Sequence, residues 1–289
     1  MNRLRLASGV LLLLWLAVLP AATQTGARRI VSVAPHLTEL VYTAGAGDRM
    51  VGADAYSDYP DAARTLPRIG DAFQLDYERV LTLRPDLVLV WDSGTPEPVI
   101  EKLRSLGLRV ERVTTARLED IATAIRRIGT LAGTEAQAEQ AAGDFTAQIA
   151  ELRRKHAHDA PVSVFFQISA APLFTISGEH LISDILAVCG GRNIFADLKQ
   201  LAPPVSVEAV LERNPEVIIA GNDSDRADDP LAHWRRWPQL TAVRYGNLYF
   251  VSADRVARST TRVVGGTQEI CSLLADARGH LASVQPQKP

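Results

Sequence analysis

Short apolar runs and helical patterns alternate along the chain from Arg29 onward. Runs such as RIVSV, RMVGA and LVLV have the length and composition of buried strands, and the segments between them carry apolar residues at helical spacing. The same alternation resumes after Pro161, where VSVFFQ and NLYFVSA read as strands. Strands that alternate with helices predict mostly parallel sheets with helices on their faces, which is the α/β class.

One segment, from Thr134 to about His156, interrupts this alternation. It contains no proline and one glycine, and its apolar residues fall on a single helical face: Ala138, Ala142, Phe145, Ile149 and Leu152. A helix of about 22 residues would extend about 33 Å. TEAQ predicts a capping box between Thr134 and Gln137 at its start. We therefore expect a single long helix over residues 134–158 that joins two Rossmann-like lobes, residues 28–133 and 159–289.

A phrase of 15 residues occurs once in each expected lobe. DYERVLTLRPDLVLV, residues 76–90, aligns without a gap with SVEAVLERNPEVIIA, residues 206–220. Each copy predicts a capped helix, a proline that ends it and a buried strand. Four identities are compatible with chance in an α/β protein. The shared cap, the glutamates Glu78 and Glu208 in the first turn and the similar position in each lobe favour an internal repeat.

The N-terminal segment has the pattern of a secretory signal peptide. Arg3 and Arg5 precede an apolar run of about ten residues, and small residues follow. A membrane anchor is the alternative, but a spanning helix needs about 20 apolar residues. We therefore expect a cleaved signal over residues 1–27 and a soluble, exported mature protein. A lipid anchor is not expected, because no cysteine lies near the cleavage region.

Composition bears on the number of domains, on nucleic-acid binding and on the presence of a disulfide. The chain has 289 residues, of which 47% are hydrophobic, and this is enough for two modest domains. Its net charge of −2 argues against a nucleic-acid-binding surface. Cys189 and Cys271 are the two cysteines. In an exported protein an even count suggests a disulfide, and two buried free thiols are the alternative.

Local motifs of common enzymes and metal sites are missing from the sequence. There is no GxSxG, P-loop, HExxH or GxGxxG motif, and the six histidines do not pair at metal-ligand spacing. Nothing in the sequence therefore demands an enzyme, and a structural zinc site is not expected. The prediction we favour is a protein that is not an enzyme and has no cofactor of its own. An exported hydrolase with an unrecognised site is the less favoured alternative.

Aromatic and polar residues gather instead at the expected carboxyl ends of strands. These residues are Tyr56, Tyr59, Trp91, Phe174, Asp254 and Arg258. Ligands of parallel α/β sheets bind at this end of the strands, so two facing lobes would enclose a cleft lined by rings and a few polar groups. Such a cleft suits a large ligand with an apolar face and hydrogen-bonding edges. For any single residue, packing within its own loop is the alternative.

Several segments resemble the periplasmic cobalamin-binding proteins of ABC importers. They are RIVSVAPHLTELVYTAGAGDRMVGADAYSDYP, ERVLTLRPDLVLVW, SLGLRV, VCGGRNIF and VSVEAVLERNPEVIIA. They extend over nearly the whole mature chain, and YSDYP and CGGRNIF are the more specific to this family. It belongs to the class III substrate-binding proteins, or helical-backbone metal receptors, in which one rigid helix joins two lobes. Siderophore and haem receptors share that form.

The resemblance implies roles for individual residues. The positions that match the family's contacts with cobalamin or a related corrinoid are Tyr56, Trp91, Phe174, Asp254 and Arg258. Glu78 and Glu208 match the glutamates that dock onto arginines of a dimeric membrane permease. Cys189 and Cys271 match the family's disulfide. We also expect the receptor to be a monomer.

Some positions depart from the family pattern and keep other ligands open. The best-known member of the family has a tryptophan six residues before each docking glutamate, where this chain has Ala72 and Ala202. Phe73 is the candidate for one missing ring. His36, at the start of the first helix, is a candidate to ligate cobalt or iron, or to hydrogen-bond a ligand's amides. Two alternatives therefore stay open, a haem receptor through His36, Tyr56 and Tyr59, and a ferric-siderophore receptor through Arg258 and Arg262.

Overall fold

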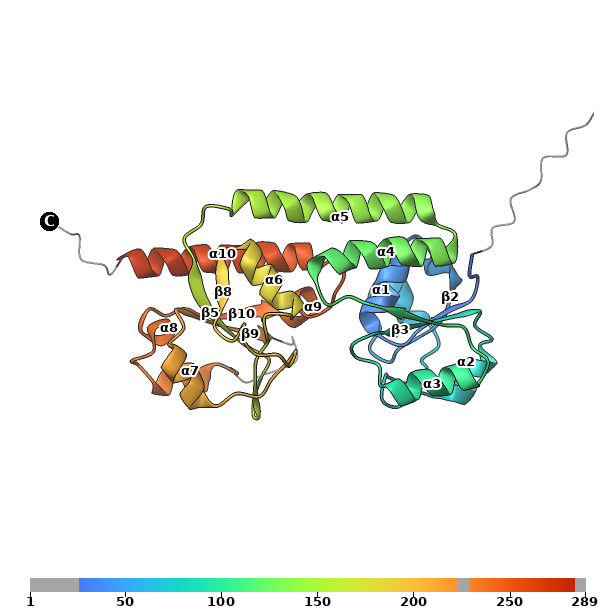
Figure 1. Cartoon of the computed structure of the whole chain (residues 1–289), viewed down its shortest axis with the longest axis horizontal. Helices are drawn as coiled ribbons and strands as arrows, with labels where there is room; N and C mark the ends of the chain where they lie inside the picture. The colour runs from blue at the N-terminus through green and yellow to red at the C-terminus, as the bar shows by residue number, and fades with distance from the viewer. Residues whose placement is uncertain (1–25, 223–228, 284–289) are drawn as a thin grey trace, which may run out of the picture.

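The computed structural model describes residues 26–222 and 229–283, which form two α/β lobes side by side (Figure 1). The expected signal peptide lies outside the described residues, except for Gly26 and Ala27. Ala27 is buried, and its N–H donates to Leu131 O at 2.7 Å, so these two residues pack against the N-terminal lobe. None of the described helices is long and apolar enough to cross a bilayer.

The N-terminal lobe is built on a four-stranded parallel sheet in the order β2-β1-β3-β4. Its strands are β1 (Ile30–Ser32), β2 (Met50–Ala53), β3 (Leu87–Trp91) and β4 (Val110–Val113). Its helices are α1 (Pro35–Thr43), α2 (Tyr77–Thr82), α3 (Glu97–Ser105) and α4 (Leu118–Ala132), with 3-10 turns η1 (Gly47–Arg49) and η2 (Asp61–Thr65). The central strand β1 is buried throughout, as a parallel sheet covered on both faces requires.

The C-terminal lobe repeats this sheet, because β8-β5-β9-β10 follows the same order as β2-β1-β3-β4. Its strands are β5 (Val162–Gln167), β8 (Gly191–Asn193), β9 (Val217–Asn222) and β10 (Leu248–Ser252), with a small hairpin of β6 (Ser169–Ala170) and β7 (Leu173–Phe174). Its helices are α6 (Leu181–Val188), α7 (Val207–Arg213), η3 (Ala232–Arg236), α8 (Thr241–Arg244), α9 (Ala253–Val256) and α10 (Val263–Ser283). The predicted fold class, two Rossmann-like lobes with parallel sheets, is confirmed.

The two copies of the repeated phrase begin with equivalent helix caps. Asp76 accepts a hydrogen bond from Arg79 N at 2.9 Å at the start of α2. Ser206 accepts one from Ala209 N at 3.2 Å at the start of α7. Each cap satisfies a backbone N–H that the first turn of a helix leaves without a partner. The strands that follow, β3 and β9, hold equivalent central places in their sheets.

The ends of the two copies also match. Arg84 and Asn214, directly before the prolines, both adopt left-handed backbone conformations with φ of 45° and 39°. Asp86 accepts hydrogen bonds from two backbone N–H groups just before β1. Glu216 accepts them from the N–H and hydroxyl of Ser163 in β5. Each acidic residue therefore ties its copy to the first strand of its own lobe, which supports an internal repeat.

The long helix α5 (Glu135–Lys155) runs along one side of both lobes, with α4 and α10 between it and the sheets (Figure 1). Its buried residues are the five that the pattern predicts: Ala138, Ala142, Phe145, Ile149 and Leu152. The predicted capping box is wrong. The Thr134 hydroxyl donates to Ala44 O at 2.6 Å, because the end of α1 lies within its reach, and so it ties α5 to the N-terminal lobe.

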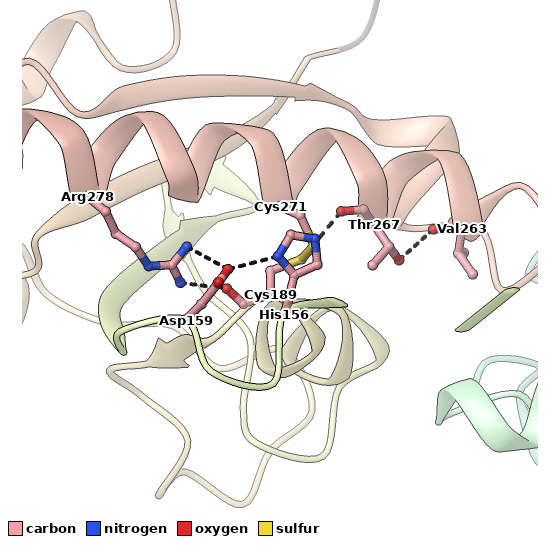
Figure 2. Close-up of a disulfide and its surroundings, with 7 residues drawn as sticks. All are labelled: His156, Asp159, Cys189, Val263, Thr267, Cys271 and Arg278. Atoms are coloured by element: carbon pink, nitrogen blue, oxygen red, sulfur yellow. Dashed lines mark hydrogen bonds and ion pairs between the residues drawn. A yellow bond between two sulfur atoms is a disulfide. The ribbon is translucent and has the colours of Figure 1, made fainter. Parts of the chain in front are cut away.

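A disulfide between Cys189 and Cys271 links the end of α6 to α10 (Figure 2). This prediction is confirmed. Arg278 on α10 donates to Cys189 O at 2.7 Å and pairs with Asp159 at 3.2 Å. His156, at the end of α5, contacts the same Asp159 carboxylate at 2.8 Å. These contacts fasten the long helix to the C-terminal lobe.

Candidate ligand-binding site

Most of the large exposed hydrophobic side chains among the described residues lie in loops at the carboxyl ends of strands, the exception being Leu81 on α2. In the part of the chain that the structure describes they are Tyr56, Tyr59, Phe73, Leu81 and Ile168. Tyr56 and Tyr59 follow β2, and Ile168 follows β5. The loop that carries Phe73 is joined to the β2 loop by a hydrogen bond from Ala55 N to Gly70 O at 2.8 Å. Exposed apolar rings at this end of α/β sheets are suited to ligand contact. Sequence reasoning missed Ile168.

Trp91 and His36 form an aromatic pair in the N-terminal lobe. Trp91 is the last residue of β3, and its ring lies edge-on to His36 with centroids 5.1 Å apart. Burial, with a smaller effect of Arg258, lowers the pKa of His36 to about 3, so the imidazole is neutral at physiological pH. His36 Nε2 and Trp91 Nε1 are buried and have no hydrogen-bond partner among the described residues. Both nitrogens are therefore candidates to pair with polar groups of a ligand.

Arg258 connects the two lobes. It follows α9, where Asp254 lies, and its Nε is 3.0 Å from the Asp254 carboxylate. Its Nη1 lies 2.5 Å from Asp58 in the loop after β2 and 3.3 Å from Glu39 on α1. The structure thus brings the predicted pair of Asp254 and Arg258 together, and places it against acidic groups of the N-terminal lobe.

Glu39 is a residue of this region that sequence reasoning missed. Its side chain is 3% exposed, and its Oε1 accepts hydrogen bonds from both Arg258 and Arg262. Burial raises the pKa of Glu39, and Arg262 opposes this effect. The Arg262 guanidinium also lies 4.6 Å above the Tyr59 ring. A signal existed in HLTELV, where a glutamate lies in a buried helical segment among the apolar residues Leu37, Leu40 and Val41.

Asp54 is a buried titratable group at the start of the tyrosine-bearing loop. It is 2% exposed and accepts a hydrogen bond from Tyr56 N at 2.8 Å. Burial raises the pKa of Asp54 to about 6, against the lowering effect of this hydrogen bond. The charge at the base of the loop therefore changes within a pH range close to neutrality.

The remaining predicted ligand residues lie farther along their loops. Phe174 is half-buried in β7, and its backbone pairs with Ser169 and with Pro204 in the same lobe. Phe73 is 76% exposed, and its N–H donates to Asp71 Oδ1 at 2.8 Å. Within residues 26–222 and 229–283, no group of three His, Cys, Asp or Glu side chains is arranged to hold a metal ion.

Glu78 and Glu208 are exposed residues in the first turns of α2 and α7. Both helices lie on the side of the molecule away from α5, one in each lobe (Figure 1). A hydrogen bond from its own backbone, together with one from Ser206, lowers the pKa of Glu208, so its carboxylate is charged at neutral pH. The two glutamates form a matched pair on one side of the molecule.

Comparison with known proteins shows similarity over most of the chain. A family model described as "Periplasmic binding protein" matches residues 30–254. A "Vitamin B12-binding protein" of Pectobacterium atrosepticum is 38% identical over 273 residues, which are 92% of this chain and 96% of that protein. The protein of the same name from Vibrio cholerae is 36% identical over 253 residues, 87% of this chain and 91% of that one.

Solved structures show the same fold. The crystal structure of the periplasmic vitamin B12 binding protein of Vibrio cholerae has a TM-score of 0.80 at 34% identity, and covers 87% of this chain and 98% of its own. A periplasmic heme-binding protein from Roseiflexus sp. RS-1 has a TM-score of 0.77 at 22% identity, and covers 87% of this chain and 99% of its own. At that identity the second likeness concerns the fold alone.

Proposed function

Since this chain belongs to the periplasmic binding protein family, we propose that it captures cobalamin or a related corrinoid between its lobes and delivers it to the permease of an ABC importer. The observation that carries the proposal is the similarity, over most of both chains, to proteins named for vitamin B12 binding. In this proposal the protein is a periplasmic monomer, acts as a receptor rather than an enzyme, and has no cofactor of its own.

The proposed binding residues suit a corrinoid, which combines a broad apolar macrocycle with amide-bearing edges. The rings of Tyr56, Trp91 and Phe174 would pack on the macrocycle, and the exposed Phe73 would add a further ring. Amide groups have both donors and acceptors. They are therefore matched by Asp254, Arg258 and His36 Nε2, which we propose as their partners.

The charges between the lobes also favour an uncharged ligand edge over an anionic chelate. The guanidinium groups of Arg258 and Arg262 are already paired with the carboxylates of Glu39, Asp58 and Asp254. A ferric siderophore or another anionic ligand would have to compete with those carboxylates for the arginines. A neutral amide would need only one hydrogen bond from the same groups.

Isothermal titration with cyanocobalamin tests the proposed ligand. We expect binding of one ligand per chain at micromolar protein, and at least about tenfold weaker binding by Trp91→Ala, since truncation of a tryptophan that acts as a binding hot spot costs about 2 kcal/mol or more. Glu97→Gln, an exposed substitution on α3, is the matched control and should bind as the wild type does. If cyanocobalamin gave no heat and hemin or a ferric siderophore bound instead, the assignment of a corrinoid ligand would be wrong, while the assignment as a receptor would stand.

We further propose that Glu78 and Glu208 dock the loaded receptor onto the permease. This role is supported by the equivalent positions of the two glutamates in the first turns of α2 and α7, on the same side of the molecule. Carboxylates are favoured at helix starts, and they bind arginine side chains of a partner in a bidentate manner. Each subunit of a dimeric permease could in this way bind one lobe of a single receptor chain.

Haem is the second candidate ligand, and His36 is the observation that favours it. The imidazole is neutral, lies beside an aromatic ring, and its Nε2 makes no hydrogen bond to any described residue, so it has the chemistry of an axial ligand to iron. Titration with hemin tests this candidate. A Soret band that moves between the wild type and His36→Ala would favour haem, whereas identical spectra would exclude ligation by His36.

A further inference from the structure

A group of ion pairs crosses from one lobe to the other, and we call it the lobe-bridging cluster. Its members are Glu39, Asp58, Asp254, Arg258 and Arg262. Glu39 comes from α1 in the N-terminal lobe, and the two arginines come from the segment between α9 and α10 in the C-terminal lobe. Helices α1 and α9 lie at the facing sides of the two lobes (Figure 1). The pairs that Glu39 and Asp58 form with the arginines therefore hold only while the lobes are close, whereas the Arg258–Asp254 pair lies within the C-terminal lobe.

Glu39 is the centre of this cluster. Its Oε1 lies 3.3 Å from Arg258 Nη1 and 3.1 Å from Arg262 Nη1, across sequence separations of 219 and 223 residues. The carboxylate is 3% exposed, whereas the side chain of Asp58 is 50% exposed. Water and salt therefore screen the Asp58 contact strongly and the Glu39 contacts only weakly.

The burial of Glu39 makes both arginines necessary to it. A buried carboxylate without a cationic partner is strongly destabilising, so opening of the lobes would leave Glu39 either uncompensated or exposed to water. Its Oε2 has no hydrogen-bond partner among the described residues, and its Oε1 accepts hydrogen bonds from the two arginines. The Thr260 side chain, from the same segment as the arginines, also favours the charged carboxylate, which opposes the rise that burial causes in the pKa of Glu39. The carboxylate thus couples the distance between the lobes to the placement of Arg258.

We propose that Glu39 is a positioning residue, which anchors Arg258 and Arg262 to the N-terminal lobe and so sets the separation of the lobes. Its effect on ligand affinity rests on the proposed function, because Arg258 is one of the proposed ligand contacts. Its effect on lobe separation does not depend on the identity of the ligand. The two effects are therefore measured separately.

The distance between the lobes in the ligand-free protein tests the proposal directly. Spin labels on Glu101→Cys in α3 and Glu212→Cys in α7, both exposed positions, report this distance by double electron–electron resonance. The native cysteines are disulfide-bonded and 0% and 2% exposed, so they do not take the label. We expect Glu39→Gln to add a population at longer distance. Glu111→Gln should leave the distribution unchanged, because it removes an ion pair with Arg127 that lies within one lobe.

A second variant separates lobe anchoring from a local role of Glu39 in α1. Arg262→Gln removes a partner from the opposite lobe and should produce the same longer-distance population. The double variant Glu39→Gln/Arg262→Gln should then show little more of the longer-distance population than Glu39→Gln alone, because both substitutions remove the same contact. If neither single variant changes the distance distribution, or if only Glu39→Gln does so, the proposal is overturned.

Ligand binding provides the second readout. In a receptor that binds cyanocobalamin, Glu39→Gln should weaken the affinity at least about tenfold, since loss of one member of a buried charge pair commonly has effects of this size. An unchanged affinity together with a changed lobe distance would overturn the positioning of Arg258. Wild-type protein that fails to bind cyanocobalamin would contradict the proposed function, while the distance measurements would still decide the role of Glu39.

Discussion

Reduction of the Cys189–Cys271 disulfide is expected to destabilise the C-terminal lobe by several kcal/mol. The two cysteines are separated by 82 residues. For a loop of this size, the chain-entropy model gives a stabilisation of about 4.5 kcal/mol at 25 °C, because the bond restricts the unfolded chain. The effect acts on the unfolded state, so it should lower the free energy of unfolding without a change in the native structure.

Native contacts around the disulfide support the expectation that reduction leaves the native structure unchanged. The cysteines are 0% and 2% exposed, and free thiols pack in such a site as small hydrophobic groups. Arg278 still joins the two helices through its bonds to Cys189 O and Asp159 (Figure 2). We therefore expect the reduced protein to retain its native circular dichroism spectrum and its ligand affinity.

Urea unfolding measures the change. Wild-type protein is unfolded with and without a thiol reductant in the unfolding buffer, and refolded to check reversibility. The reduced form should lose up to about 4.5 kcal/mol, with the upper end reached where no native strain offsets the entropy. The double variant Cys189→Ala/Cys271→Ala is the control and should respond to urea in the same way with or without reductant. A loss below about 1 kcal/mol, with native spectra in both forms, would refute the entropic reasoning.

Three further predictions concern docking and pH. Glu78→Ala combined with Glu208→Ala should keep ligand affinity and abolish uptake, because both glutamates are exposed on the side away from α5; normal import would contradict docking. Burial raises the folded-state pKa of Asp54 from 3.8 to about 6, so the native state holds the proton more tightly than the unfolded state does. The free energy of unfolding of the wild type should therefore fall by up to roughly 3 kcal/mol as pH rises from about 4 to above 6. Asp54→Asn should lack this fall in urea unfolding, and a difference from wild type that is constant with pH would contradict the assignment. Burial lowers the folded-state pKa of His36 to about 3, so as pH decreases the unfolded state takes up the proton before the native state does. The free energy of unfolding of the wild type should therefore fall as pH decreases from about 6.5 towards 3. His36→Gln should remove that part of the acid sensitivity, and an unaltered acid limb of the stability profile would count against a buried neutral imidazole.

Much of the fold was predictable because the relevant signals are local. The five buried residues of α5 follow from their spacing of three and four, and the caps at Asp76 and Ser206 follow from residue type and position. The disulfide was predictable for a different reason, since two cysteines allow a single intramolecular pairing. Helix and strand periodicity depends on neighbouring residues only, so one sequence is sufficient to read it.

Polar partners were predicted less well than apolar faces. The Thr134 hydroxyl was assigned to its own helix, but it reaches Ala44 O, 90 residues earlier in the chain. Several acceptors are within reach of a threonine at a helix start, and the choice between them depends on what the rest of the fold places nearby. The same limit hid Glu39, which the apolar pattern of its helix marks as buried without naming a partner.

The sequence by itself determined two α/β lobes, the long helix between them, the repeated capped helices with Glu78 and Glu208, and the aromatic residues at strand ends. Only the tertiary structure decided which charged groups meet, above all Glu39 with Arg258 and Arg262 across more than 200 residues. The physical reason is that burial of apolar residues follows a periodic pattern, while burial of a charge requires one specific opposite charge within a few ångströms. That proximity arises from the packing of the two lobes and has no local signature in the chain.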